Sequence, residues 1–236
     1  MINYLFDVDG TLTYARQPMA SDFKDFFVEW INKQRSLGNK VFLVTGSDSK
    51  KTVEQIGQPL WRYVDGSFQN CGNQYYEQGK LRWQSSWRMS ADLHFDILEL
   101  LEASRWYGTA GLNIEERVGM VNISTIGREA TAQQRREYFV WDEINEERKH
   151  IAKSLSFKHY DLDFAIGGEI SIDIYRKGAD KSQVLKCVQG STYFFGDRCE
   201  PYGNDYPLYS YPGIIGNSVH NPEETFEKLN KFFLAI

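Results

Sequence analysis

The first fifty-seven residues alternate between two hydrophobic patterns. Residues 2–8 form a short apolar run that ends in turn residues, which is typical of a buried strand. Between residues 22 and 37 large apolar side chains recur three and four positions apart, and Gly38 follows, which predicts an amphipathic helix. Residues 40–57 then read as a second buried strand, a turn and a helix. This alternation predicts a parallel sheet covered by helices.

The middle of the chain follows a different pattern. We expect a helix near residues 90–104, paired strands within 112–128, and a charged helix from about 132 to 154. The pattern favours a separate α+β module.

Two segments of this module alternate strictly between polar and apolar residues. In residues 169–175 the isoleucines share one face, and Ser171 and Asp173 share the other. In residues 119–124 the same rule puts Asn122 on a polar face. Each strand therefore offers an apolar face to cover with helices and a polar face, which fits a small antiparallel sheet.

The opening pattern resumes after this module. A helix is expected to start at Lys181, a strand at 192–197, and a closing helix after Asn221 and Pro222, which are good start signals. We therefore expect an α/β core interrupted by an inserted α+β cap. The predicted divisions are 1–82 for the first core segment, 83–179 for the cap and 180–236 for the second core segment.

Composition narrows the classes of protein that fit. The 236 residues include 25% charged and 42% hydrophobic side chains, as in ordinary globular proteins. A net charge of −5 gives no broad footprint for nucleic acid, and no run of eighteen apolar residues predicts a membrane span. A catalytic candidate at position 7 leaves no room for a cleaved signal, so we expect a cytoplasmic protein. The three cysteines lack metal-ligand spacing.

Four carboxylates stand where two predicted strands end. Asp7 and Asp9 in "DVDGT" follow the first strand, and Asp197 and Asp205 in "GDRCEPYGND" follow a later one. Alone, such residues are more often turn or cap residues. Neighbouring parallel strands would bring them together, and the like charges would repel unless a hard cation such as Mg²⁺ were bound. Asp7 could then attack a phosphoryl group, and Asp9 could act as acid and base.

The other parts of a phosphoryl-transfer site are also present. Thr45 or Ser47 lies at a strand-to-helix turn, where backbone N–H groups can bind an anion. Lys181 precedes the second acidic strand and could neutralise charge on the transferring group. Each alone has an ordinary alternative, since a serine there is often an N-cap and a lysine is often solvated. Together they form one set.

In their order, "DVDGT", "TGSD", Lys181 and "FFGD" resemble the haloacid dehalogenase (HAD) superfamily of aspartate-nucleophile phosphotransferases. More narrowly, "FDVDGTLTYARQ", "RVGMVNISTIGR", "GGEISIDIYRKGADK" and "FFGDRCEPYGND" are similar to the eukaryotic-type phosphomannomutases. The similarity runs nearly end to end. It implies a HAD-like Rossmannoid parallel-sheet core with an inserted α+β cap of type IIB.

The resemblance also implies roles for individual residues. Asp7 would be the nucleophile, Asp9 the acid and base, and Mg²⁺ would bind to Asp7, the Asp9 backbone oxygen and Asp197, with Asp205 in the same acidic group. Catalytic roles extend to Ser47 and Lys181. The expected substrate-binding residues are Arg16, Arg117, Asn122, Arg128, Arg135, Ser171 and Asp173. Arginine suits a distal phosphate because its planar fork can bind phosphate through two hydrogen bonds.

Three functions fit this set of residues. The first is a mutase that interconverts mannose 1-phosphate and mannose 6-phosphate through an aspartyl phosphate, with a hexose 1,6-bisphosphate as activator and intermediate. The second is a sugar-phosphate phosphatase on the same fold. The third, a catalytically silent sugar-phosphate-binding protein, is disfavoured because the catalytic side chains are all present. The resemblance further suggests a homodimer formed through the cap.

Overall fold

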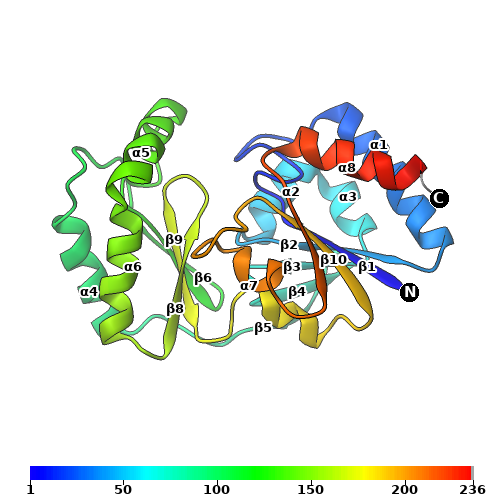
Figure 1. Cartoon of the computed structure of the whole chain (residues 1–236). Coiled ribbons are helices and arrows are strands. Elements are labelled where there is room, and N and C mark those ends of the chain that lie inside the picture. Colours follow the sequence, from blue (N-terminus) through cyan, green and yellow to red (C-terminus); the bar gives the residue numbers. More distant parts are fainter. Residues whose placement is uncertain (235–236) are drawn as a thin grey trace.

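The computed structural model describes residues 1–234, and the side chains of residues 1–231. Two sheets divide these residues into two lobes that lie side by side (Figure 1). The larger sheet is built from both ends of the chain, and the smaller from its middle. The α/β core with an inserted α+β cap, expected from the sequence, is therefore confirmed.

The core sheet has seven strands in the order β11-β10-β1-β2-β3-β4-β5. From β11 to β3 neighbouring strands are parallel, whereas β4 and β5 are antiparallel additions at one edge. The strand bounds are β1 (Ile2–Phe6), β2 (Lys40–Val44), β3 (Gly66–Gln69), β4 (Gln74–Glu77), β5 (Lys80–Gln84), β10 (Ser191–Gly196) and β11 (Ile214–Ser218).

Helices cover both faces of this sheet. On one face Phe27 and Trp30 pack against Tyr4 and Phe6 of β1, and on the other Leu5 packs in a cluster with residues that follow β9 and β10. Because side chains alternate along a strand, β1, which is apolar except for Asn3, serves both layers. The core helices are α1 (Ser21–Ser36), α2 (Ser49–Ile56), α3 (Gln58–Tyr63), the 3₁₀ helix η1 (Lys181–Lys186), α7 (Tyr206–Tyr209) and α8 (Pro222–Leu234).

The cap is a four-stranded antiparallel sheet in the order β6-β7-β9-β8, with helices on one face. Ile172 and Ile174 are fully buried beneath Ile97 and Leu155 of the helices. The cap elements are α4 (Ala91–Glu102), β6 (Ile114–Arg117), β7 (Met120–Ser124), α5 (Ala132–Asn145), α6 (Glu147–Lys158), β8 (Leu162–Gly167) and β9 (Ser171–Arg176).

The other face of the cap sheet, which carries Ser171 and Asp173, turns toward the core. Both side chains are buried, so this polar face is an interface and not a solvated surface. The predicted cap boundaries of 83 and 179 stay a prediction. β5, which pairs within the core sheet, runs to Gln84 across the first of them.

The single charged helix expected from about 132 to 154 is wrong, because two helices occupy this stretch. Glu146 separates α5 from α6 with a left-handed φ of 52°. Asp142 accepts hydrogen bonds from the backbone N and the Nε of Arg148, at 3.0 and 2.6 Å. Glu147 accepts hydrogen bonds from the Ser104 hydroxyl. These buried carboxylates bind groups around the break and stabilise the turn between the helices.

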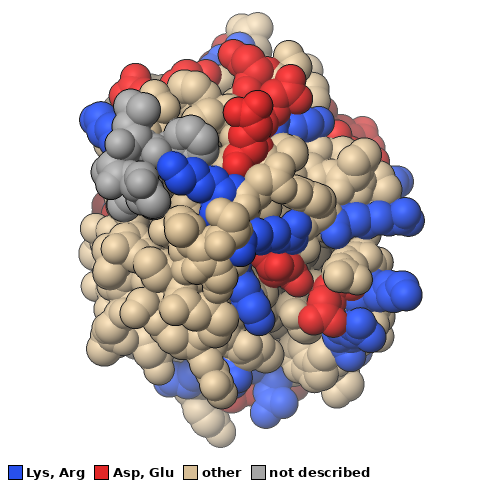
Figure 2. Space-filling view, turned by 90° about the vertical axis from the view of Figure 1, so that its right-hand side faces the viewer, with Lys and Arg blue, Asp and Glu red and all other residues tan. Residues whose placement is uncertain are grey.

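The helix expected at Lys181 is present, but it is a 3₁₀ helix of six residues. Asp180 caps it by accepting a hydrogen bond from the backbone N of Ser182 at 2.7 Å. The prediction omitted α3, α7, β3 to β5, β8 and β11. Figure 2 shows the side of the core remote from the cap, where basic and acidic side chains are interspersed beside a broad uncharged area.

Candidate active site

Lys181 links two of the predicted carboxylates. Its Nζ donates to Asp7 Oδ1 at 2.7 Å and to Asp205 Oδ1 at 2.6 Å, and all three side chains are almost completely buried. Burial alone would lower the pKa of Lys181, but Asp205 and Asp7 raise it well above the usual value. The ammonium therefore stays charged and offsets the negative charge around the nucleophile candidate.

Asp197 completes a group of three carboxylates. Oxygens of Asp7, Asp197 and Asp205 lie within 4.8 Å of one another. The register of the sheet explains this, because β1 and β10 are parallel neighbours and Asp7 and Asp197 follow their carboxyl ends. Asp205 is fixed in place because its Oδ2 accepts from the backbone N of Asp197 and Arg198, at 3.1 and 3.0 Å.

The chemistry of this group fits a divalent cation. Burial and the neighbouring carboxylates raise the pKa of both Asp7 and Asp197, so the protein alone disfavours their full ionisation. An ion such as Mg²⁺ prefers carboxylate and backbone oxygens and would offset that cost. The backbone beside Asp9 is also close, since a Cβ on Gly10 would lie 2.3 Å from Asp197 Oδ2.

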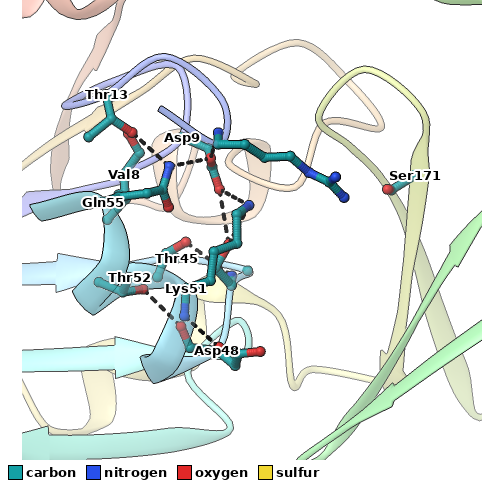
Figure 3. A network of polar contacts seen from close by, with 12 residues as sticks. Val8, Asp9, Thr13, Thr45, Asp48, Lys51, Thr52, Gln55 and Ser171 are labelled. Carbon is teal, nitrogen blue, oxygen red and sulfur yellow. Dashed lines mark hydrogen bonds and ion pairs between the residues drawn. The ribbon is translucent and has the colours of Figure 1, made fainter. Parts of the chain in front are cut away.

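Asp9 lies beside this group, in a separate network (Figure 3). Its Oδ2 accepts from Lys51 Nζ at 2.6 Å and from the Ser47 hydroxyl at 2.9 Å, and its Oδ1 accepts from Gln55 Nε2 at 2.8 Å. The backbone N of Arg16 is 3.3 Å away. Burial alone would raise the pKa of Asp9, but Lys51 and the other donors lower it to about 2. Asp9 is thus held as a carboxylate.

Ser47 and Thr45 have different roles at the start of α2. Asp48, and not Ser47, is the N-cap residue, because its side chain accepts from the backbone N of Lys51 at 2.8 Å. The Ser47 hydroxyl can therefore donate to Asp9. Thr45 Oγ1 accepts from the backbone N of Ser47 at 3.1 Å, which shapes the turn.

Sequence reasoning missed Lys51 and Gln55, although a signal was available. Ser47, Lys51 and Gln55 are four residues apart, and residues at this spacing share one face of a helix. All three side chains donate to Asp9. A polar stripe at this spacing, directly after the turn that follows β2, indicates a helix face turned toward a site.

Arg117 and Arg128 of the cap converge on one carboxylate. Arg117 Nη2 donates to Glu115 Oε2 at 2.7 Å, and Arg128 Nη2 donates to the same oxygen. Burial alone would raise the pKa of Glu115, but the two guanidinium groups lower it to about 2. Arg117 also crosses to the core, where its Nη1 donates to the Gly46 carbonyl at 2.8 Å.

Arg16 and Arg135 add positive charge to the same region. Arg135 donates to the backbone carbonyls of Ala130 and Arg128, both at 2.9 Å, and Arg16 of the core donates to the Arg128 carbonyl at 3.4 Å. Burial, together with the charges of Arg16 and Arg128, lowers the pKa of Arg135 to about 10. Four arginines thus gather in one region, where two of them share the Glu115 carboxylate, and this arrangement suits an anion.

The polar face of the cap sheet lies over the turn at Gly46. Asp173 Oδ1 accepts from Asn122 Nδ2 at 2.6 Å, and Asp173 Oδ2 accepts from Asn204 Nδ2 of the core at 3.0 Å. Ser171 Oγ is 3.4 Å from Arg128 Nη1. Ser171 therefore lies beside Arg128, and Asn122 and Asp173 lie where the cap contacts the core. Asn204, which sequence reasoning did not assign, joins them.

Comparisons with known proteins identify the family. A family model described as eukaryotic phosphomannomutase matches residues 27–235. The chain belongs to the eukaryotic phosphomannomutase family. The phosphomannomutase of Arabidopsis thaliana is 34% identical and is aligned over 98% of this chain and 96% of its own length. The phosphomannomutase of Saccharomyces cerevisiae is 33% identical and is aligned over 97% of this chain and 93% of its own length. The chain is therefore an enzyme that transfers a phosphoryl group intramolecularly.

Solved structures confirm the HAD-like fold. A HAD subclass IIB sugar phosphatase has a TM-score of 0.59 at 12% identity, with 99% of this chain and 100% of that chain covered. The C-terminal domain of a Candida albicans trehalose-6-phosphate phosphatase has a TM-score of 0.65 at 14% identity, with coverage of 100% and 93%. At these identities the likeness concerns the fold. In the described part of this phosphomannomutase-family chain, no helix has the length and apolar character needed to cross a bilayer.

Proposed function

We propose that this chain interconverts mannose 1-phosphate and mannose 6-phosphate, with Asp7 as the carrier of the phosphoryl group. The family match over nearly the whole chain carries the proposal. The geometry supports it, because Asp7, Lys181 and Asp205 are buried together with the half-buried Asp197 beside them, and the cap contributes several arginines nearby.

The reaction divides into two transfers. In the first, a carboxylate oxygen of Asp7 attacks the phosphorus of a hexose 1,6-bisphosphate, and the bond to the sugar oxygen breaks. That oxygen takes the proton that Asp9 gained from the attacking hydroxyl in the preceding transfer. In the second, a hydroxyl of a hexose monophosphate attacks the aspartyl phosphate and loses its proton to Asp9. The bisphosphate is thereby regenerated, with Asp7 free again.

Cofactor and core residues support these transfers. When bound by Asp7, Asp197 and the Asp9 backbone oxygen, with Asp205 beside them, Mg²⁺ would neutralise phosphoryl oxygens and orient them. Lys181 supplies fixed positive charge at Asp7. Ser47 is placed to donate to the phosphoryl group when its hydrogen bond to Asp9 is released.

The cap residues would hold the other end of the substrate. Arg16, Arg117, Arg128 and Arg135 suit whichever phosphate is distal from Asp7, and Asn122, Ser171 and Asp173 suit the sugar hydroxyls. Because the bisphosphate must present either end to Asp7, the cap has to bind both orientations. It must also keep water away from the aspartyl phosphate, since attack by water would make the enzyme a phosphatase.

A coupled assay tests the proposal. The enzyme is given mannose 1-phosphate, a hexose 1,6-bisphosphate and Mg²⁺, and both mannose 6-phosphate and inorganic phosphate are measured. We expect isomerisation that depends on the bisphosphate and exceeds phosphate release. Release of phosphate without isomerisation would replace the mutase with a sugar-phosphate phosphatase, and no turnover of either kind would leave a binding protein.

The remaining parts of the proposal concern the oligomeric state, the partners and the cellular location of the enzyme. A homodimer through the cap is supported by apolar side chains on its helices, because Phe95 of α4 and Phe157 of α6 are 69% and 77% exposed. The hexose phosphate substrate requires neither a nucleic acid nor a membrane partner. A cytoplasmic enzyme of this activity would supply mannose 1-phosphate for GDP-mannose biosynthesis.

A further inference from the structure

A core segment between two of the acidic residues pairs with the cap. This segment, residues 198–204, connects Asp197 to Asp205. The Ile166 backbone N donates to the Tyr202 carbonyl at 2.7 Å, and the Asn204 backbone N donates to the Ile166 carbonyl at 3.2 Å. Ile166 belongs to β8, an edge strand of the cap sheet, so the segment extends that sheet by one β-bridge.

Arg198 adds side-chain contacts to the same junction. Its Nη2 donates to the Gly168 carbonyl at 2.9 Å, and its guanidinium carbon lies 5.1 Å from the centre of the Phe139 ring on α5. Gly168 also accepts from Arg148 of the cap at 3.0 Å. One core side chain therefore contacts two separate elements of the cap, the turn between β8 and β9 and helix α5.

The segment is rigid where it supports Arg198. The Arg198 carbonyl accepts from the backbone N of Asp205 at 3.1 Å, and the Gly203 backbone N donates to the Glu200 carbonyl at 2.8 Å. A Cβ on Gly203 would lie 2.1 Å from the Arg198 carbonyl oxygen, so the chain folds tightly on itself there. A movement of the cap at this junction is thus transmitted to a fixed part of the core.

We propose that Arg198 is a positioning residue for the reaction, which holds the cap closed on the 198–204 segment and so keeps water from the site. Its Nε lies 3.8 Å from Asp197 Oδ2, but it closes the cap through the hydrogen bond to Gly168 and the stacking on Phe139. The planar guanidinium suits both contacts at once, whereas the ammonium of a lysine cannot make them together.

Loss of the stacking contact in Phe139→Ala weakens closure and leaves the ion pair between Arg198 and Asp197 in place. An exposed cation–π contact contributes enough to change the ratio of open to closed cap about two- to fivefold. While the cap is open, water can reach the aspartyl phosphate, so phosphate release gains on isomerisation. This consequence rests on the proposed function, whereas the closing of the cap itself does not.

The test combines two variants with a matched control. Arg198→Ala removes the core side of the contact, and Phe139→Ala removes the cap side at a distance in sequence from the acidic residues. Arg105→Ala is the control, because Arg105 stacks on Trp141 at 5.9 Å wholly within the cap. Two quantities are measured, namely the hydrogen-exchange rate of the Ile166 amide and the ratio of phosphate release to isomerisation.

We expect both quantities to rise about two- to fivefold in Phe139→Ala and by at least as much in Arg198→Ala, which also loses the hydrogen bond to Gly168. The double variant should show no further rise over Arg198→Ala, and the control should stay unchanged. Unchanged exchange at Ile166 in both variants would overturn the proposal, even if phosphate release rose. Equal changes in Arg105→Ala would overturn it as well, because they would indicate general loosening of the cap. If the wild type does not isomerise at all, the proposed function fails, while the exchange rates still decide the role of Arg198.

Discussion

Replacement of Lys181 by methionine tests how much the buried lysine stabilises the fold by offsetting the negative charge of Asp7 and Asp205. Lys181 is about 1% exposed and is bound to two carboxylates that are at most 6% exposed. Methionine fills a similar volume but carries no charge, so Asp7 and Asp205 remain buried without their common partner. Breaking a buried ion pair from one side typically costs about 3 to 5 kcal/mol.

A loss of about 4 kcal/mol lowers the ratio of folded to unfolded protein about a thousandfold. The assay is urea unfolding at pH 7 with a chelator present, so that no divalent cation compensates for the missing charge. Lys186→Met is the matched control, because Lys186 lies in the same 3₁₀ helix and is exposed. We expect the control to differ from the wild type by less than about 0.5 kcal/mol.

The reasoning is refuted if Lys181→Met is no less stable than Lys186→Met. Such a result would mean that the carboxylates are already neutral in the folded protein, or that water solvates them. A second measurement distinguishes stability from chemistry. Even where Lys181→Met is fully folded at low temperature, its turnover should be lost, because the fixed charge at Asp7 is gone.

Four further predictions concern single side chains. Asp7→Asn should abolish turnover and leave the circular dichroism spectrum unchanged; retained activity would remove Asp7 from the mechanism. Arg128→Ala should raise KM for a hexose phosphate about tenfold and leave KM for acetyl phosphate unchanged, and equal effects would contradict the role of the cap. Lys51→Met should raise the pKa of Asp9 from about 2 and so move the acid limb of kcat/KM to higher pH, unlike exposed Lys50→Met. For Glu115 the folded pKa of about 2 lies below the ordinary 4.5, so its carboxylate stabilises the fold above pH 4.5 and loses that effect toward pH 2. The difference in Tm between the wild type and Glu115→Gln should therefore shrink on acidification, and a constant difference would argue against the pairing with arginine.

Structural features that follow from strand and helix periodicity could be predicted from the sequence. The strand that carries Asp7 and the one that carries Asp197 are short apolar runs, and their pairing in parallel brings the two carboxylates together. The alternation around Ser171 and Asp173 likewise gave the correct face of the cap sheet. In both cases the local pattern and the tertiary environment agree, because each apolar side chain is buried.

Other features depend on contacts that no local pattern records. The strand β5 alternates polar and apolar residues along its sequence, but it is exposed along its whole length, so no buried face fixes its conformation and only pairing with β4 does. Glu146 breaks a helix in favourable helical surroundings, because Asp142 and Arg148 pair across the break. Arg198 contacts Phe139, which is distant in sequence and belongs to the other lobe. Such long-range partners decide conformation where local preference is weak.

The order of strands in the core has a consequence for synthesis on the ribosome. β1 lies between β2 and β10, and β10 follows the whole cap in the chain. Since chains grow at about 5 to 20 residues per second, the nascent protein exposes one bare edge of β1 for several seconds. The cap is contiguous and can fold during that interval, whereas Asp7 at the end of β1 gains its buried lysine only when translation is nearly complete.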